Sequence, residues 1–180
     1  QLELFVGLID LASLFGAVLS HFLADKFGRK GCMSISAVIF VLSVLGMGLS
    51  WDYASLMFFR FCTGVGVGIG LAIGPLYISE LAPEDYRGKL VSWTELATNV
   101  GIVLGFLAGY VLEDMPITEG WRVMLGLGSI MPAILLICLF FMPESPRWLV
   151  RNDSIKMAHG VLTNIYHDEV DVDPIVEEIQ

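Results

Sequence analysis

Three ionisable side chains, Asp10, Arg60 and Glu95, stand inside long apolar stretches of the sequence. An ionisable group at the centre of a membrane helix costs about 2.5 to 3.5 kcal/mol on insertion scales, so all three are candidates for functional groups. Asp10 and Arg60 both lie about 10 Å from the outer ends of their stretches, at 1.5 Å of helical rise per residue. They could pair with each other. The alternative is a purely structural ion pair, or an Asp10 that reaches water at the interface.

A polar stripe surrounds the third of these residues. Glu95, Thr98 and Asn99 fall with Thr94 on one helix face, because residues three and four apart are neighbours on a helix surface. Such a stripe should face a cavity, where it could hydrogen-bond hydroxyl groups, and the adjacent Trp93 could stack on a sugar ring. The alternative is that these side chains only join neighbouring helices through hydrogen bonds.

Short and highly charged connections link the apolar stretches on one side. The segment from Asp25 to Lys30 turns tightly at Gly28, and further charged residues are expected at the same membrane level. A single exposed ion pair contributes about 0 to 1 kcal/mol, but a network across helix ends could bias which side of a carrier is closed. Ordinary loop charges without a gating role are the alternative. The residues of this predicted gate are Asp25, Arg29, Lys30, Glu80, Arg87, Glu144 and Arg147.

The composition indicates that lipid surrounds most of the chain. Hydrophobic residues make up 56% of the 180 positions and charged residues 16%, with a mean hydropathy of +0.74, outside the usual range for soluble domains. Most of the net charge of −9 lies in the C-terminal tail, and no basic face exists for nucleic acid. The cysteines lack metal-ligand spacing and no nucleophile stands beside a base. We therefore expect no enzyme activity, no catalytic residue, no cofactor and no metal.

Five apolar stretches are long enough to cross a hydrocarbon core of about 30 Å as helices. Eight of the ten Lys and Arg residues fall in connections on one side, Arg122 lies on the other, and Arg60 lies within a span. By the positive-inside rule the first side is cytoplasmic, so Gln1 starts outside and the tail ends in the cytosol. The predicted spans run from Leu4 to Ala24, Met33 to Ser50, Tyr53 to Ser79, Leu90 to Leu112 and Val123 to Met142.

Glycines recur every four residues in two of the predicted spans, on one side of a helix each time. Small residues at this spacing let neighbouring helices approach closely. The first run follows no strand and has the wrong spacing for a dinucleotide-binding loop. Pro75 should bend the same span, because its ring removes a helical hydrogen bond. The glycine sets are Gly64 with Gly68, Gly66 with Gly70 and Gly74, and Gly101 with Gly105 and Gly109.

After Pro143 the pattern becomes that of a soluble segment. Ser154 can cap a helix whose apolar stripe is formed by Ile155, Ala158, Leu162 and Ile165. A further short helix could open at the pair Asp173 and Pro174. The segment from 143 to 180 is therefore expected to be cytosolic and helical.

Five motifs in order resemble the sugar porter family of the major facilitator superfamily. The stretch from Gln1 to Glu3, with Ser92 to Glu95, is most similar to plant polyol and monosaccharide proton symporters. The motifs are Asp25 to Lys30, Arg60 with its glycine run, Pro75 to Pro83 followed by Arg87 and Gly88, Gly120 to Arg122, and Pro143 to Leu149.

This resemblance implies an all-α integral membrane fold, the N-terminal half of a twelve-helix carrier. Residues 1–142 would be its second to sixth helices and 143–180 the start of an intracellular helical domain. The first helix and the C-terminal half would then be partners supplied by the rest of the carrier. The resemblance also implies that Arg60 partners a proton-accepting Asp of the first helix, and that Glu95 stands where many relatives have a substrate-contacting Gln. Asp10, where relatives often carry an amide, would be either a substitute carboxylate or a second one.

The leading hypothesis is proton-coupled symport of a monosaccharide or polyol by alternating access. In this hypothesis Glu95, Thr98, Asn99 and Trp93 bind substrate, while Arg60 and Asp10 couple the proton. An uncoupled sugar facilitator is the first alternative, and a sugar sensor or truncated paralogue that moves nothing is the second. The expected location is a multi-pass position in the lipid bilayer, in the plasma membrane more than in an organelle membrane.

Overall fold

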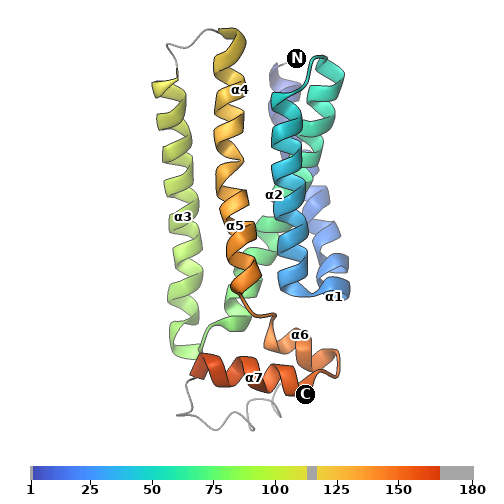
Figure 1. Cartoon of the computed structure of the whole chain (residues 1–180), viewed down its shortest axis with the longest axis vertical. Coiled ribbons are helices and arrows are strands. Elements are labelled where there is room, and N and C mark those ends of the chain that lie inside the picture. Colours follow the sequence, from blue (N-terminus) through green and yellow to red (C-terminus); the bar gives the residue numbers. More distant parts are fainter. Residues whose placement is uncertain (1, 113–116, 167–180) are drawn as a thin grey trace.

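The computed structural model describes residues 2–112 and 117–166, which form helices joined by short connections (Figure 1). The long helices run roughly along one axis, and two short helices lie across one end of the molecule. We call this end the α6–α7 end. The helices are α1 (Leu2–Gly48), α2 (Tyr53–Leu81), α3 (Glu84–Val111), α4 (Ile117–Gly128), α5 (Ile130–Phe141), α6 (Pro146–Arg151) and α7 (Ile155–Tyr166).

Helix α1 is a hairpin of two arms. Its membrane-compatible part, Gly7–Gly48, has 42 residues, and a straight helix of that length would measure about 63 Å, twice the hydrocarbon core. Gly28 interrupts it with φ 81° and ψ 172°, a left-handed conformation that glycine adopts without a steric penalty. The arms then lie side by side, and the Sγ atom of Cys32 is 3.9 Å from the carbonyl oxygen of Ser20.

The hairpin reconciles the predicted spans with the observed helices. Among the described residues, four helical stretches are long and apolar enough to cross a membrane, the fourth formed by α4 and α5 together (Arg122–Phe141). The first of them contains two of the five predicted spans. The expected loop from Asp25 to Lys30 is shorter than predicted, since helical geometry continues up to Gly28 on both sides. The fifth predicted span is divided into α4 and α5. Pro132 lacks the amide hydrogen that would bond to the carbonyl of Gly128, which accounts for the break at Ser129.

The glycines of α2 let it pack against both arms of α1, as predicted. A Cβ atom on Gly64 would lie 2.6 Å from the Cβ of Ala12, and one on Gly66 would lie 3.3 Å from the carbonyl oxygen of Ser36. The two glycine faces therefore contact the first and second arm respectively. On α3 the corresponding prediction is wrong for Gly101 and Gly105, where a Cβ would meet nothing within 4 Å in the described structure. Gly109 does lie close to α4, since a Cβ there would be 3.2 Å from the Cε atom of Met124.

Helix α3 is the least buried of the long helices, and its membrane-compatible part has no buried residue. It contacts α2 and α4 only sparsely, whereas α1 and α2 pack extensively. At the α6–α7 end, Leu149 and Val150 of α6 form a small core with Ala158 and Leu162 of α7. Ile155, predicted to share that stripe, is exposed instead. The helix predicted at Asp173 and the end of the predicted 143–180 segment lie outside the described residues.

Candidate functional site

A buried ion pair joins the α1 turn to the end of α2. The Arg29 guanidinium donates from Nε to Oε2 of Glu80 at 3.0 Å and from Nη2 to Oε1 at 3.0 Å. The two side chains are only 13% and 6% exposed. Two parallel charge-assisted bonds of this kind fix geometry as well as charge. Nη1 of Arg29 also donates to the carbonyl of Ala24 at 3.3 Å, which ties the guanidinium to its own turn.

Helix α6 is anchored on this pair by its first residues. Ser145 is fully buried, and its hydroxyl donates to Oε2 of Glu80. As the N-cap of α6, Oγ of Ser145 also accepts a hydrogen bond from the backbone amide of Trp148. Oε1 of Glu144 accepts hydrogen bonds from the backbone amide nitrogens of Lys30 and Ser145, both at 2.9 Å. The carboxylate of Glu144 therefore closes the α1 turn and the start of α6 together.

Gly28 makes this approach possible. A Cβ atom there would lie 2.7 Å from the carboxyl carbon of Glu144, so any larger residue would displace that carboxylate. On α2, the Tyr77 hydroxyl donates to the carbonyl of Pro143, immediately before Glu144. Hydrogen bonds thus connect the turn of α1, the end of α2 and the start of α6 to one another.

Asp25 extends this set of contacts to the second turn of α6. Its carboxylate lies 3.0 Å from Nη1 of Arg151 and 4.0 Å from Nη1 of Arg29, and its carbonyl accepts from the Trp148 indole at 3.1 Å. The Arg151 side chain is 68% exposed, so solvent screens this outer pair. We refer to Asp25, Arg29, Glu80, Ser145 and Arg151 as the α6 anchor.

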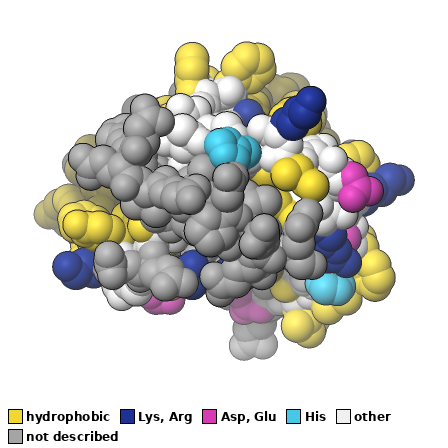
Figure 2. All heavy atoms as spheres, turned by 90° about the horizontal axis from the view of Figure 1, so that it is seen from below, with side chains coloured by type: hydrophobic (Ala, Val, Ile, Leu, Met, Phe, Trp, Pro, Cys, Tyr) yellow, Lys and Arg dark blue, Asp and Glu magenta, His cyan; other side chains and the backbone are white. Residues whose placement is uncertain are grey.

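The structure brings some of the predicted gate residues into contact with one another and leaves others separate. Asp25, Arg29 and Glu80 form ion pairs, and Glu144 acts through backbone amides. Lys30 directs its ammonium to the carbonyl of Phe140 at 3.4 Å. Figure 2, viewed onto the α6–α7 end, shows basic side chains near the rim with acidic side chains beside several of them.

Two predicted gate arginines stand outside the α6 anchor. Within the described residues, neither Arg87 nor Arg147 forms an ion pair. The Nε atom of Arg87 is buried without a hydrogen-bond partner there, and the Arg147 side chain is exposed.

Asp10 and Arg60 lie at similar depth on adjacent helices. Gly64, one turn beyond Arg60, packs against Ile9 and Ala12, so the two charged residues are within about one turn of each other along the helix axes. Asp10 is exposed. The ion pairs of the described residues do not include one between these two side chains. Their predicted role in proton coupling stays a prediction.

The predicted polar stripe lies on the exposed surface of α3. Within the stripe, Thr98 donates to the carbonyl of Thr94 at 2.9 Å and Asn99 to that of Glu95 at 2.8 Å. Within the described residues, the hydrogen bonds of these side chains stay within α3, whereas the carboxylate and amide oxygens remain on the surface. The stripe is thus able to accept hydrogen bonds from a solute or from another helix.

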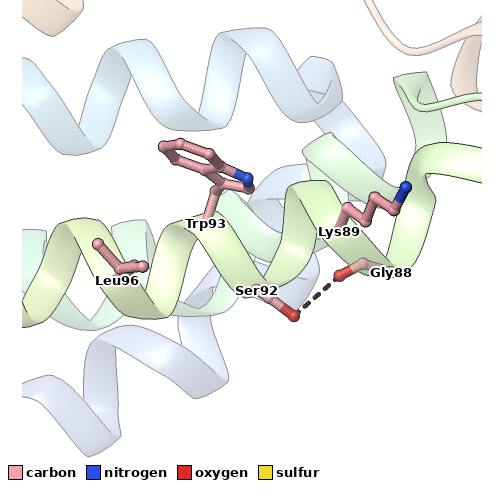
Figure 3. Close-up of a pocket in the computed structure, with 5 residues that line it drawn as sticks. All are labelled: Gly88, Lys89, Ser92, Trp93 and Leu96. Carbon is pink, nitrogen blue, oxygen red and sulfur yellow. Dashed lines mark hydrogen bonds between the residues drawn. The ribbon is translucent and has the colours of Figure 1, made fainter.

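Trp93 belongs to a different face of the same helix. It stands two residues before Glu95, which places the two side chains roughly 160° apart around the helix. With Lys89, Ser92, Leu96 and the backbone at Gly88 it lines a shallow open pocket (Figure 3). The structure therefore brings together Glu95, Thr98 and Asn99 but separates Trp93 from them.

A family model described as Sugar (and other) transporter matches residues 1–180, the whole chain. The chain belongs to the sugar transporter family. Polyol transporter 5 of Arabidopsis thaliana is 40% identical over 90% of this chain and 30% of the relative's length. The glucose transporter GlcP of Staphylococcus epidermidis is 36% identical over 97% of this chain and 39% of the relative's length.

The fold of this family member matches solved structures closely. The proton:xylose symporter XylE of the major facilitator superfamily, bound to 6-bromo-6-deoxy-D-glucose, gives a TM-score of 0.90 at 28% identity, covering 98% of this chain and 42% of that chain. The fold class predicted from sequence, a helical membrane fold of the major facilitator superfamily, is confirmed. The chain spans less than half the length of each of these relatives. The prediction that it is not an enzyme agrees with them, since all are named as transporters or a symporter.

Sequence reasoning assigned no role to four residues in or beside the α6 anchor of this sugar transporter chain. Ser145 carried a local signal, because a serine before proline at the start of a helix is a typical N-cap. Arg151 carried no such signal, since its partner Asp25 lies more than 120 positions away in the sequence. Trp148, whose indole donates to the carbonyl of Asp25, belonged to the motif from Pro143 to Leu149 but had no assigned role. Tyr77 was part of a recognised motif without an assigned role.

Proposed function

We propose that these helices are part of a carrier that moves a monosaccharide or polyol across a membrane by proton-coupled symport and alternating access. The observation that carries the proposal is the polar stripe of Glu95, Thr98 and Asn99, exposed in the middle of a helix that is apolar enough to span a membrane. Such groups are costly in lipid, which favours an aqueous cavity as their surroundings. A second candidate within the family is uncoupled facilitation of the same solutes.

The relatives support the same solute class. Those quoted above are named as polyol and glucose transporters, and the solved structure is titled as a proton:xylose symporter. Structures of XylE titled as partially occluded inward open and as inward open give TM-scores of 0.89 and 0.83 with this chain. Since the TM-scores are similar for structures titled as different states, they support an N-terminal half that keeps its internal structure and moves largely as a rigid body.

In the proposed carrier, residues 1–142 act as the second to sixth helices and 143–180 as a cytosolic helical segment. The first helix and the C-terminal half belong to the rest of the protein, and the plasma membrane is the proposed location. The α6–α7 end faces the cytosol, since it carries most of the basic residues. The predicted gate residues Arg87 and Arg147 would then be available to acidic groups of the opposite half.

A carboxylate near Arg60 gives the proposed proton coupling a physical basis. Protonation removes a negative charge beside a guanidinium, which changes the relative free energies of outward and inward states. Asp10 lies at the right depth for this role, and a first-helix carboxylate is the other candidate. In the same scheme Glu95 accepts hydrogen bonds from the solute hydroxyls.

Uptake by the complete carrier should rise as the external pH falls and should collapse when a protonophore dissipates the gradient. The reason is that symport draws its driving force from the inward movement of protons. Uptake of a radiolabelled polyol or monosaccharide into cells that lack their own carrier measures this. Saturable uptake that responds to neither treatment would contradict proton coupling and leave the facilitator.

Two substitutions test the site residues separately. We expect Glu95→Gln to raise KM several-fold, because an amide replaces an acceptor of about twice the hydrogen-bond strength.

Arg60→Leu should abolish proton-driven accumulation while exchange of solute across the membrane continues. Asp153→Asn, the same acid-to-amide change on the exposed turn between α6 and α7, is the control and should behave like the unmodified carrier. Unchanged kinetics in both test variants, at equal surface expression, would remove these residues from the mechanism.

A further inference from the structure

We propose that the pocket at the start of α3 binds the phosphate of an anionic phospholipid from the cytoplasmic leaflet. The pocket is lined by Lys89, Ser92, Trp93, Leu96 and the backbone at Gly88. Figure 3 shows Lys89 and Trp93 projecting from the same side of the helix, and the Ser92 hydroxyl bonded to the carbonyl of Gly88 at 3.0 Å. The site is cationic at one end and apolar at the other.

The position of the pocket matches a membrane interface. The predicted span of α3 begins at Leu90, so Lys89 immediately precedes it and Trp93 lies about 5 Å inside it at helical rise. Tryptophan and tyrosine are enriched at this level, and lysine extends its ammonium toward the headgroups. Trp93 is 68% exposed and Tyr86 57% exposed, with the Lys89 ammonium 5.7 Å from the Tyr86 ring centroid.

The helix face above the pocket suits an acyl chain. From Trp93 the side chains of Leu96, Val100 and Val103 follow at intervals of three and four, on one face of α3, and each is about half exposed or more. Lys89 to Val100 covers about 16 Å at helical rise, close to half of the hydrocarbon core. One phospholipid molecule therefore matches the face in length and polarity.

The pocket at the start of α3 and the polar stripe proposed to bind solute lie on different faces of the helix, so they are separate sites. The polar stripe lies mostly on the side opposite the pocket, with Glu95 roughly 160° from Trp93. One helix can present its polar stripe to an aqueous cavity and this apolar face to lipid. The proposal depends on the membrane orientation of the proposed function, but its measurement below needs no transport.

Charge favours an anionic headgroup over a zwitterionic one. Within the described residues, the Lys89 ammonium has no carboxylate partner, and the ring of Tyr86 is its neighbour. The attraction between one lysine ammonium and anionic lipid contributes about 1 kcal/mol near the bilayer surface, which corresponds to about fivefold enrichment of anionic lipid. A phosphodiester can accept from the ammonium and from the Ser92 hydroxyl once that hydroxyl rotates away from Gly88.

Quenching of Trp93 by brominated lipids tests the inference in the complete carrier. The carrier is placed in phosphatidylcholine nanodiscs that contain equal small fractions of acyl-brominated phosphatidylglycerol or acyl-brominated phosphatidylcholine. Subtracting the signal of Trp93→Phe isolates the contribution of Trp93. We expect about fivefold preference for the brominated phosphatidylglycerol. Lys89→Gln should remove the preference, while Lys156→Gln, the same charge change on α7, should keep it.

Three results would overturn the proposal. Absence of quenching at Trp93 by either lipid would mean that protein covers this face. An equal preference in Lys89→Gln and in the unmodified carrier would exclude the lysine as the phosphate ligand. Loss of the preference when glycerol phosphate is added to the solution would assign the site to a soluble phosphate instead of a lipid. None of these outcomes depends on whether the carrier transports sugar.

Discussion

Glu80→Ala should nearly abolish transport by the complete carrier and lower its thermal stability more than any other single change at the α6–α7 end. The substitution leaves the Arg29 guanidinium, 13% exposed, without its bidentate partner and leaves the buried Ser145 hydroxyl without its acceptor. Breaking a buried pair from one side typically costs about 3 to 5 kcal/mol, because an uncompensated charge stays in the protein. Melting of the purified carrier in detergent and initial rates of uptake measure the two effects.

Arg151→Gln is the matched control for this prediction. It also breaks an ion pair, but Arg151 is 68% exposed and its partner Asp25 is 40% exposed. Exposed pairs contribute about 0 to 1 kcal/mol, so the melting temperature should change little. If Glu80→Ala had the same melting temperature as Arg151→Gln, the ion pair between Arg29 and Glu80 would not be what holds α6 on the membrane helices.

Gly68→Ala should destabilise the carrier strongly, although it adds only one methyl group. A Cβ atom on Gly68 would lie 2.7 Å from the carbonyl carbon of Ser13 and 2.8 Å from its Cα. The obstructing atoms belong to the backbone, so no side-chain rotation relieves the clash and α2 must move away from the first arm of α1. Overpacking costs about 1 to 3 kcal/mol, and we expect the upper part of that range. Thermal melting and the yield of monodisperse protein measure it.

Gly74→Ala provides the control on the same helix. A Cβ atom there meets nothing within 4 Å, and alanine is favoured over glycine in helix interiors by about 1 kcal/mol. This variant should therefore melt at the same temperature as the unmodified carrier or slightly above it. Equal losses in the two variants would show that helix flexibility, and not close packing against α1, is what the glycines of α2 provide.

Most of the fold followed from periodicity and composition. Apolar stretches of about twenty residues located the membrane helices, and glycine at intervals of four predicted the close contact of α2 with its neighbours. The tight turn at Gly28 was also predicted, because a short charged connection between two spans needs a residue that tolerates positive φ. These features depend on local sequence alone, which is why single-sequence reasoning reached them.

Contacts between distant segments were harder to predict. Lys30 uses its backbone amide to hold Glu144, a role that no side-chain pattern reveals. The same limit applies to Arg87 and Arg147, whose charges predicted a network that the described residues do not complete. The sequence analysis assigned Trp93 and Glu95 to one substrate site, although residues two apart lie roughly 160° from each other on a helix, and it did not show which face of α3 would be lined by a pocket.

The hairpin of α1 also has a consequence for biosynthesis. Most of the close glycine contacts lie within the first 81 residues, so the unit formed by the two arms of α1 and by α2 can assemble while the ribosome is still making α3. Proteins fold from the N-terminus during synthesis, and an early stable unit limits the time that exposed segments spend unpaired. Defects in this unit would therefore reach quality control in the cell before they could alter any rate of sugar movement.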